Sequence, residues 1–187
     1  MQGREVAPLT PDGQELTDFY GVDPQRNEIY YGLAAPTPME RHVFRAKLPE
    51  LQPTTSAPTQ PVPTATMLSR ESGKTTARFS TTYDYHVLQH TQIDQPLRVS
   101  LHRRDEELRV LQDNQALVLK LRSAPLGKKT LMQVPESDST MLNAYVIQPQ
   151  NFNPKKTYPL LMFVYGGPGS QTVDASLGQN YLWFQYL

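Results

Sequence analysis

The sequence reads Tyr85-His-Val-Leu-Gln-His90, then Leu97-Arg-Val-Ser-Leu-His102, then Leu108-Arg-Val-Leu111, three short runs of residues that favour extended structure. Turn segments that contain Asp94-Gln-Pro96 and Arg104-Asp-Glu-Glu107 separate these runs. Short runs with apolar residues at alternate positions, bounded by turn signals, are typical of antiparallel strands joined by tight connections. This part of the chain is therefore predicted to form an antiparallel sheet.

Thr76-Ala-Arg-Phe-Ser80 precedes these runs and gives the predicted sheet a fourth strand. A second group of strands is predicted nearer the N-terminus, in residues 19–22, 28–34 and 41–48. Pro24 lies in the turn between the first two of them, where it presets φ for the first corner. The chain is thus predicted to contain two groups of about four short strands each.

The third strand of the N-terminal group has an imperfect alternation. We expect His42, Phe44 and Leu48 to lie on one side of it, whereas Val43 and Ala46 fall out of step. We interpret residues 41–48 as a strand in spite of this irregularity.

Each group alone would be an exposed sheet, and an isolated sheet of this size is marginally stable. Four-stranded antiparallel sheets that stack radially form the blades of a β-propeller, which is the predicted architecture of residues 1–120. Residues 49–74 are rich in Pro and Thr. Because proline cannot donate to a ladder of hydrogen bonds, this stretch is predicted to be a mobile surface loop.

The pattern changes near Asn114. Residues 115–122 predict a short helix, and residues 130–134 and 141–147 predict a pair of strands. The run Tyr158-Pro-Leu-Leu-Met-Phe-Val-Tyr165 is then apolar without alternation. Continuous hydrophobicity is typical of a strand covered on both faces, as in the central sheet of an α/β domain. An α/β domain is therefore expected to begin in this region.

Glycines follow this run directly, in Tyr165-Gly-Gly-Pro-Gly-Ser-Gln171. Glycine lets the backbone approach a ligand closely and adopt a positive φ. In α/β-hydrolases, a loop of this kind after an early strand supplies donors to the oxygen that becomes negative during the reaction. A plain tight turn would have the same composition, so the pattern alone leaves both interpretations open.

Composition and charge exclude several classes of protein. The 18 basic and 18 acidic residues balance, so no long-range field draws the chain to nucleic acid or to anionic lipid. The chain has no Cys, which excludes disulfides and thiolate metal sites. No apolar run reaches the roughly 20 residues of a membrane span, and the first residues lack the apolar core of a signal peptide. If the parent protein is exported, its signal is expected to lie upstream.

The four histidines, His42, His86, His90 and His102, all fall in predicted strands. His86 and His90 are four residues apart. This spacing brings two side chains together on one face of a helix, but it does not do so on a strand. We interpret all four as ordinary residues of a sheet, and we expect neither a metal nor another cofactor.

Several stretches are distinctive when taken together. They are Pro38-Met-Glu-Arg-His-Val-Phe44, Ala77-Arg-Phe-Ser80, Pro96-Leu-Arg-Val-Ser-Leu101, Leu108-Arg-Val-Leu-Gln-Asp-Asn114, Phe152-Asn-Pro-Lys-Lys-Thr-Tyr-Pro-Leu-Leu160 and Tyr165-Gly-Gly-Pro-Gly-Ser-Gln-Thr-Val-Asp174. In this order and spacing, the chain resembles the dipeptidyl peptidase IV-like serine peptidases of the prolyl oligopeptidase superfamily.

The resemblance implies all-β, antiparallel β-propeller blades over residues 1–120 and the beginning of an α/β-hydrolase domain over residues 121–187, both domains being incomplete. It implies a parent protein that releases N-terminal dipeptides, usually after Pro or Ala, through a Ser-His-Asp mechanism. The substrate would be a peptide with a free N-terminus. The parent would be periplasmic, secreted or membrane-anchored, and relatives often form homodimers.

By the same resemblance, Tyr165 donates its hydroxyl to the oxyanion. The family's nucleophile lies in a Gly-x-Ser-x-Gly pattern, which this chain lacks, and its acid, its histidine and its substrate-binding glutamates are also expected elsewhere. Asp174-Ala-Ser-Leu-Gly178 imitates the pattern, but Asp stands where the sharp turn needs Gly. Ser176 is therefore a poor nucleophile candidate, and the segment alone is expected to be inactive.

Two other interpretations stay open. One is a different α/β-hydrolase such as a prolyl iminopeptidase, in which His-Gly-Gly-Pro-Gly occupies a comparable loop; here Tyr165 stands in place of that His. The other is a non-catalytic binding module built on propeller blades. A Gly-x-Ser-x-Gly pattern downstream of Leu187 would favour the peptidase.

Overall fold

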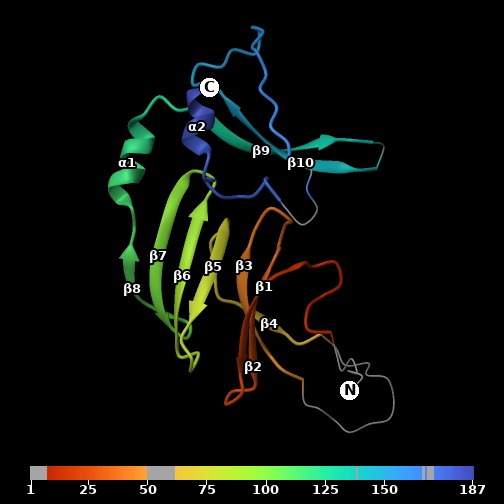
Figure 1. Ribbon diagram of the computed structural model, residues 1–187, viewed down its shortest axis with the longest axis vertical. Coiled ribbons are helices and arrows are strands. Elements are labelled where there is room, and N and C mark those ends of the chain that lie inside the picture. Colours follow the sequence, from red (N-terminus) through yellow and green to blue (C-terminus); the bar gives the residue numbers. More distant parts are fainter. Residues whose placement is uncertain (1–7, 50–61, 138, 166, 168–170) are drawn as a thin grey trace.

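The structure is a computed structural model that describes residues 8–49, 62–137, 139–165, 167 and 171–187. The elements in these ranges form two four-stranded antiparallel sheets, a two-stranded hairpin and two short helices (Figure 1). None of the helices described is long and apolar enough to cross a membrane. The two four-stranded sheets confirm the predicted antiparallel sheets, and they are consistent with a propeller region.

The first sheet has the strand order β1-β2-β3-β4. Its strands are β1 (Leu16–Asp23), β2 (Glu28–Leu33), β3 (His42–Lys47) and β4 (Ala65–Met67). The first three match predicted strands. The prediction of a loop over all of residues 49–74 is wrong at β4, which pairs with β3, while residues 50–61 lie outside the described part of the chain. Three residues are too few to show a periodic pattern, so pairing with β3 decides their conformation.

The second sheet has the strand order β5-β6-β7-β8, and all of its neighbouring strands are antiparallel. Its strands are β5 (Lys74–Phe79), β6 (Tyr85–Gln92), β7 (Gln95–Arg103) and β8 (Glu106–Gln112). Each contains or overlaps one of the four predicted runs. The alternation between turn signals was thus sufficient to locate this sheet.

The turn between β1 and β2 is built by Asp23 and Arg26. One carboxylate oxygen of Asp23 accepts hydrogen bonds from the backbone N–H groups of Gln25 (2.9 Å) and Arg26 (3.2 Å). The Arg26 guanidinium donates to the other oxygen at 2.7 Å and also to the carboxylate of Asp84 in the second sheet's first turn. This turn therefore links the two sheets as well as two strands.

The core consists of two hydrophobic clusters, one on each face of β3. The buried members of the first cluster are Ile29, Tyr31, Leu33, Ala35 and Ala46. The second cluster lies between the two sheets, and its buried members are Val43 from β3, Ala77 from β5 and Leu88 from β6. The sheets therefore pack on each other through apolar side chains, as stacked sheets do.

β3 is covered on both faces, which explains its imperfect alternation. Val43 belongs to the second cluster, whereas Phe44, Ala46 and Leu48 contact or belong to the first. The prediction that Ala46 falls out of step with Phe44 and Leu48 is wrong, because residues two apart along a strand share a face.

The remaining elements are α1 (Gln115–Ser123), the hairpin strands β9 (Lys128–Pro135) and β10 (Met141–Gln148), and α2 (Tyr181–Tyr186). The first three correspond to predicted elements, and α2 was not predicted. Figure 1 shows the hairpin and α2 at one end of the two sheets.

The apolar run over residues 158–165 is not a strand in this structure, so the buried strand and the start of an α/β domain predicted there are not shown. Its side chains are exposed, with Leu160 at 79% and Phe163 at 57% exposure. No strand among the described residues pairs with it. A run of this kind needs a partner on each edge and cover on each face. The described residues supply no partner strand, and the ring of Phe163 packs on that of Phe184 in α2 with centroids 5.5 Å apart.

Candidate functional site

Tyr165, the predicted site residue, is 59% exposed, and its hydroxyl makes no hydrogen bond to another described residue. Its ring lies against Gly167. A Cβ added at Gly167 would be 2.6 Å from Cε1 of the ring and 2.9 Å from the hydroxyl oxygen. Any larger residue at position 167 would therefore displace the Tyr165 ring.

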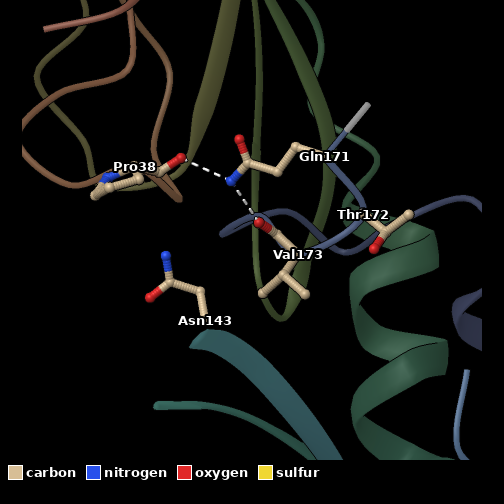
Figure 2. A pocket seen from close by; sticks show the side chains of 5 residues that line it. All are labelled: Pro38, Asn143, Gln171, Thr172 and Val173. Atoms are coloured by element: carbon tan, nitrogen blue, oxygen red, sulfur yellow. Dashed lines mark hydrogen bonds between the residues drawn. The ribbon is translucent and has the colours of Figure 1, made fainter. Parts of the chain in front are cut away.

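The next described residues, 171–177, form what we call the clamp segment. Gln171 leads it: its Nε2 donates to the carbonyl oxygens of Pro38 and Val173, both at 2.7 Å, and its Oε1 accepts from the Arg41 guanidinium. Figure 2 shows the first two of these bonds, which lie beside a shallow, open pocket of about 280 Å³. This pocket is lined by Pro38, Asn143, Gln171, Thr172 and Val173.

Further hydrogen bonds fix the clamp segment along its length. The Ala175 N–H donates to the Met39 carbonyl at 2.8 Å, and the Leu177 N–H donates to the Thr91 hydroxyl at 3.4 Å. Lys129 of the hairpin donates from Nζ to the Ser176 carbonyl at 2.8 Å. The segment is thereby attached to both sheets and to the hairpin.

Asp174 is the charged centre of the clamp segment. Its Oδ2 accepts from Lys74 Nζ at 3.0 Å, and its Oδ1 accepts from the backbone N–H of Ser176 at 3.2 Å and from the Ser176 hydroxyl. Burial alone would raise the pKa of Asp174, but the hydrogen bonds from Ser176 and Lys74 and the charge of Lys74 together lower it. Asp174 is therefore a carboxylate at neutral pH, paired with Lys74.

Ser176 is buried, and its hydroxyl donates to Asp174. Among the described residues, no histidine forms a hydrogen bond with it. A serine nucleophile needs an adjacent base and an open approach for the substrate. The acceptor of the Ser176 hydroxyl is the Asp174 carboxylate, which is paired with Lys74, and burial of Ser176 leaves no open approach, so its hydroxyl serves the local turn.

The four histidines lie in β3, β6 and β7. His86 stacks on His102 with ring centroids 5.0 Å apart, and Thr75 Oγ1 lies 2.8 Å from Nδ1 of His90. Nδ1 of His42 lies 2.9 Å from Ser69 Oγ. In the part of the chain that the structure describes, no three His, Asp or Glu side chains gather closely enough to hold a metal ion.

Sequence reasoning did not identify Lys74, Asp174 or Gln171 as functional residues. For two of them the resemblance offered a signal, because Gln171 and Asp174 belong to the quoted stretch that begins at Tyr165. Arg41, the partner of Gln171, belongs to another quoted stretch, Pro38–Phe44. The structure brings these two distinctive stretches into direct contact.

Residues 1–97 match the family model described as the dipeptidyl peptidase IV (DPP IV) N-terminal region. The match covers more than half of the chain. The chain belongs to this DPP IV family. The two sheets described above therefore lie largely in a DPP IV N-terminal region.

Individual relatives of the DPP IV family extend the similarity beyond residue 97. The chain is 31% identical over 174 residues to dipeptidyl peptidase 4 of Arthroderma otae, covering 92% of this chain and 21% of that protein. It is 30% identical over 174 residues to dipeptidyl peptidase 4 of Trichophyton rubrum, again with 92% and 21% coverage. The chain thus spans about a fifth of the length of these relatives.

A solved structure supports the same assignment. The crystal structure of Porphyromonas gingivalis dipeptidyl peptidase 4 superposes with a TM-score of 0.77 at 29% sequence identity. The superposition covers 90% of this chain and 22% of that one. The backbone arrangement of the two sheets and of much of the remainder is therefore shared with a DPP IV relative.

Proposed function

We propose that this chain is part of a longer serine-type dipeptidyl peptidase that releases N-terminal Xaa-Pro or Xaa-Ala dipeptides from peptides with a free N-terminus. The observation that carries the proposal is the extent of similarity to dipeptidyl peptidase 4 relatives. It covers 92% of the chain and therefore runs far past the N-terminal region into the segment around Tyr165.

In this proposal, residues 1–120 are propeller blades and residues 121–187 begin the α/β-hydrolase domain. The exposed apolar run over residues 158–165 supports this division, because exposed apolar surface of this kind marks a contact with another part of a protein. In the longer protein, the run would become a strand covered on both faces by the rest of the hydrolase sheet.

Tyr165 would donate its hydroxyl to the oxyanion of the tetrahedral intermediate. The hydroxyl is free of hydrogen bonds to other described residues, and the ring is held against Gly167. A donor placed in advance where negative charge develops lowers the barrier, because it need not reorganise during the reaction. The nucleophile, its base and the acid would come from outside this chain.

The test is hydrolysis of a Gly-Pro chromogenic amide by the longer protein and by residues 1–187 alone. Activity in the longer protein only is the expected result. Tyr165→Phe in the longer protein should slow acylation by about a hundredfold, the scale of one lost oxyanion donor. Activity in residues 1–187 alone would overturn the assignment of the nucleophile, and inactivity of both proteins would favour a non-catalytic binding module.

A further inference from the structure

The short helix α2 is joined to the base of the hairpin by the side chain of Gln185. Its Nε2 donates to the Gly127 carbonyl at 2.8 Å, and its Oε1 accepts from the Gly127 N–H at 2.6 Å. One side chain thus binds both backbone groups of a single residue, as the partner residue in an antiparallel strand pair does. Gly127 is buried and lies directly before β9. The C-terminal end of α2 is therefore held against the hairpin.

The base of the hairpin is closely packed at Gly127. A Cβ added at this position would be 2.1 Å from the carbonyl oxygen of Gln148, the last residue of β10. Glycine is the residue that allows such a close approach of two backbone segments. Any other residue at position 127 would have to move the end of β10. The attachment point of α2 is thus fixed within the hairpin.

The residues that lead into α2 are attached to the same hairpin by Lys129. Its Nζ donates to the carbonyl oxygens of Ser176 and Leu177 at 2.8 Å and 3.5 Å. The same ammonium lies 4.4 Å from the centre of the Tyr145 ring in β10, a distance at which a cation is attracted to an aromatic face. Contacts before α2 and at its C-terminal end therefore hold it on the hairpin.

α2 in turn contacts the run over residues 160–165 through an aromatic pair. The rings of Phe163 and Phe184 have centroids 5.5 Å apart and planes tilted by 52°, which is a favourable arrangement for two aromatic side chains. Phe163 precedes Tyr165 by two residues, so their Cα atoms are at most about 7 Å apart. The structure describes the chain without a break from Phe163 to Tyr165. A movement of α2 would therefore reach Tyr165 through two peptide units.

We propose that Phe184 is a positioning residue for Tyr165. Gln185 holds α2 on the hairpin, and Phe184 holds the run on α2 through the ring of Phe163. The Tyr165 hydroxyl thereby acquires a defined place relative to the hairpin. The inference rests on the proposed peptidase function for its catalytic consequence, whereas the attachment of α2 to Gly127 does not depend on that function.

A positioning role differs from a general role in the stability of α2, and Leu182 provides the control. Leu182 is 58% exposed and lies on the same helix. Because each residue of an α-helix turns by about 100°, Leu182 and Phe184 point in directions about 200° apart. Leu182→Ala therefore shortens an apolar side chain of α2 without removing the contact with Phe163. A loss that comes from weakening the helix should appear in this control as well.

The experiment compares Phe184→Ala, Phe184→Leu and the control Leu182→Ala in the longer protein, with a Gly-Pro chromogenic amide as substrate. Phe184→Ala should lower kcat about tenfold and change KM by less than about twofold, because a transition-state interaction is weakened by displacement of the donor. Phe184→Leu keeps apolar bulk against Phe163 and should lower kcat by less than about threefold. Leu182→Ala should keep kcat near the starting value. Equal losses in Phe184→Ala and Leu182→Ala, or no loss in Phe184→Ala, would overturn the proposal.

A second comparison shows whether the effect passes through Tyr165. In a Tyr165→Phe background there is no hydroxyl left to position, so Phe184→Ala should cause almost no further loss of kcat. Interacting residues show such non-additivity, whereas independent residues have additive effects. A further tenfold loss in that background would mean that Phe184 acts by another route, and the proposal would be wrong.

Hydrogen exchange separates failure of this inference from failure of the proposed function. Gln185→Met removes both hydrogen-bonding groups at similar side-chain length, so the Gly127 amide should exchange about tenfold faster. Gln179→Met is the control, because Gln179 is exposed and precedes α2, and it should leave this exchange unchanged. An inactive longer protein would refute the proposed function, and the attachment of α2 would then be judged on exchange alone. Unchanged exchange at Gly127 in Gln185→Met would overturn the inference whatever the activity.

Discussion

Apart from Glu28 and Gly32 of β2, β2 and the run over residues 160–165 consist of apolar and aromatic residues, but their environments are opposite. Both lack a clean alternation of polar and apolar residues. All six residues of β2, Glu28–Leu33, are buried, whereas every residue from 160 to 165 is exposed. β2 has β1 and β3 as neighbours, one on each edge. The run has no neighbouring strand among the described residues.

The comparison shows what a continuous apolar run encodes. Such a run specifies that both faces need cover, but the cover itself comes from other parts of the fold. In β2 the cover comes from the first cluster on one side and from the second sheet on the other, where the ring of Tyr30 stacks on that of Tyr83 at 4.9 Å. The four predictions below test or sharpen this difference.

The largest effect is expected from Tyr31→Ala in β2. Tyr31 is 1% exposed and belongs to the first cluster. Removing a large buried aromatic side chain leaves a cavity and should lower the free energy of unfolding by about 3–5 kcal/mol. Leu161→Ala, in the exposed run, should change it by less than about 0.5 kcal/mol. Urea denaturation measures both, and similar losses would contradict the contrast.

A smaller loss is expected from Arg104→Met, which removes a link between β2 and the second sheet. Arg104 donates from Nη1 to the Tyr30 hydroxyl at 2.7 Å and from Nη2 to Glu28 Oε2 at 2.9 Å. Hydrogen bonds that involve a charged group are worth about 2 kcal/mol. Arg103→Met is the control, because the guanidinium of Arg103 lies over the ring of Tyr85 within the second sheet and does not link this sheet to β2. Urea denaturation at neutral pH should show a loss of about 2 kcal/mol for Arg104→Met and much less for Arg103→Met.

Acid should weaken the contact between the sheets through His86. Burial, and then the nearby His102, lower the pKa of His86 to about 4 from an ordinary value of 6.5. Between these values the unfolded chain binds a proton that the folded chain does not, so stability falls as pH drops from 6.5 towards 4. His86→Phe removes this group and should make stability depend less on pH in that window. Thermal unfolding at pH 7, 6, 5 and 4 compares the two proteins, and parallel curves would count against His86.

The smallest effect on stability is expected from replacing both Leu161 and Val164 by Ser. Their side chains are exposed, so the free energy of unfolding of residues 1–187 should change by less than about 0.5 kcal/mol. Light scattering should decrease, because exposed apolar surface promotes association. In the longer protein, the same double substitution should be clearly destabilising. No loss there would mean that the run stays uncovered.

Local patterns predicted most of the two sheets. The strands β6, β7 and β8 are joined by two-residue connections that contain Asp94 and Asp105, so their limits can be read to within a few residues from the local sequence. β4 has only three residues, and α2, over Tyr181–Tyr186, has no polar face, so neither carries a usable period. Both are placed by contacts with distant parts of the chain.

The candidate site was less predictable for the same reason. The resemblance pointed to Tyr165, but the bond between Lys74 and Asp174 joins residues that are 100 positions apart. Nothing in the local sequence around either residue indicates its partner. Alternation likewise placed the histidines in strands, but it could not show that His86 and His102 would stack.

Gly21 has a consequence for the geometry of the whole stack of sheets. It lies in β1 with φ +124°. A Cβ at this position would be 2.0 Å from the hydroxyl oxygen of Tyr83. The same hydroxyl donates a hydrogen bond to the Tyr20 carbonyl at 3.3 Å. A side chain at position 21 would displace the Tyr83 ring, which stacks on Tyr30 of the first sheet, and would so disturb the packing between the two sheets. For sheets arranged around a common axis, the spacing of each pair sets the angle between them, and the ring closes only if these angles sum to a full circle. The absence of a Cβ atom at Gly21 thus helps to set the angle between neighbouring sheets in such a ring.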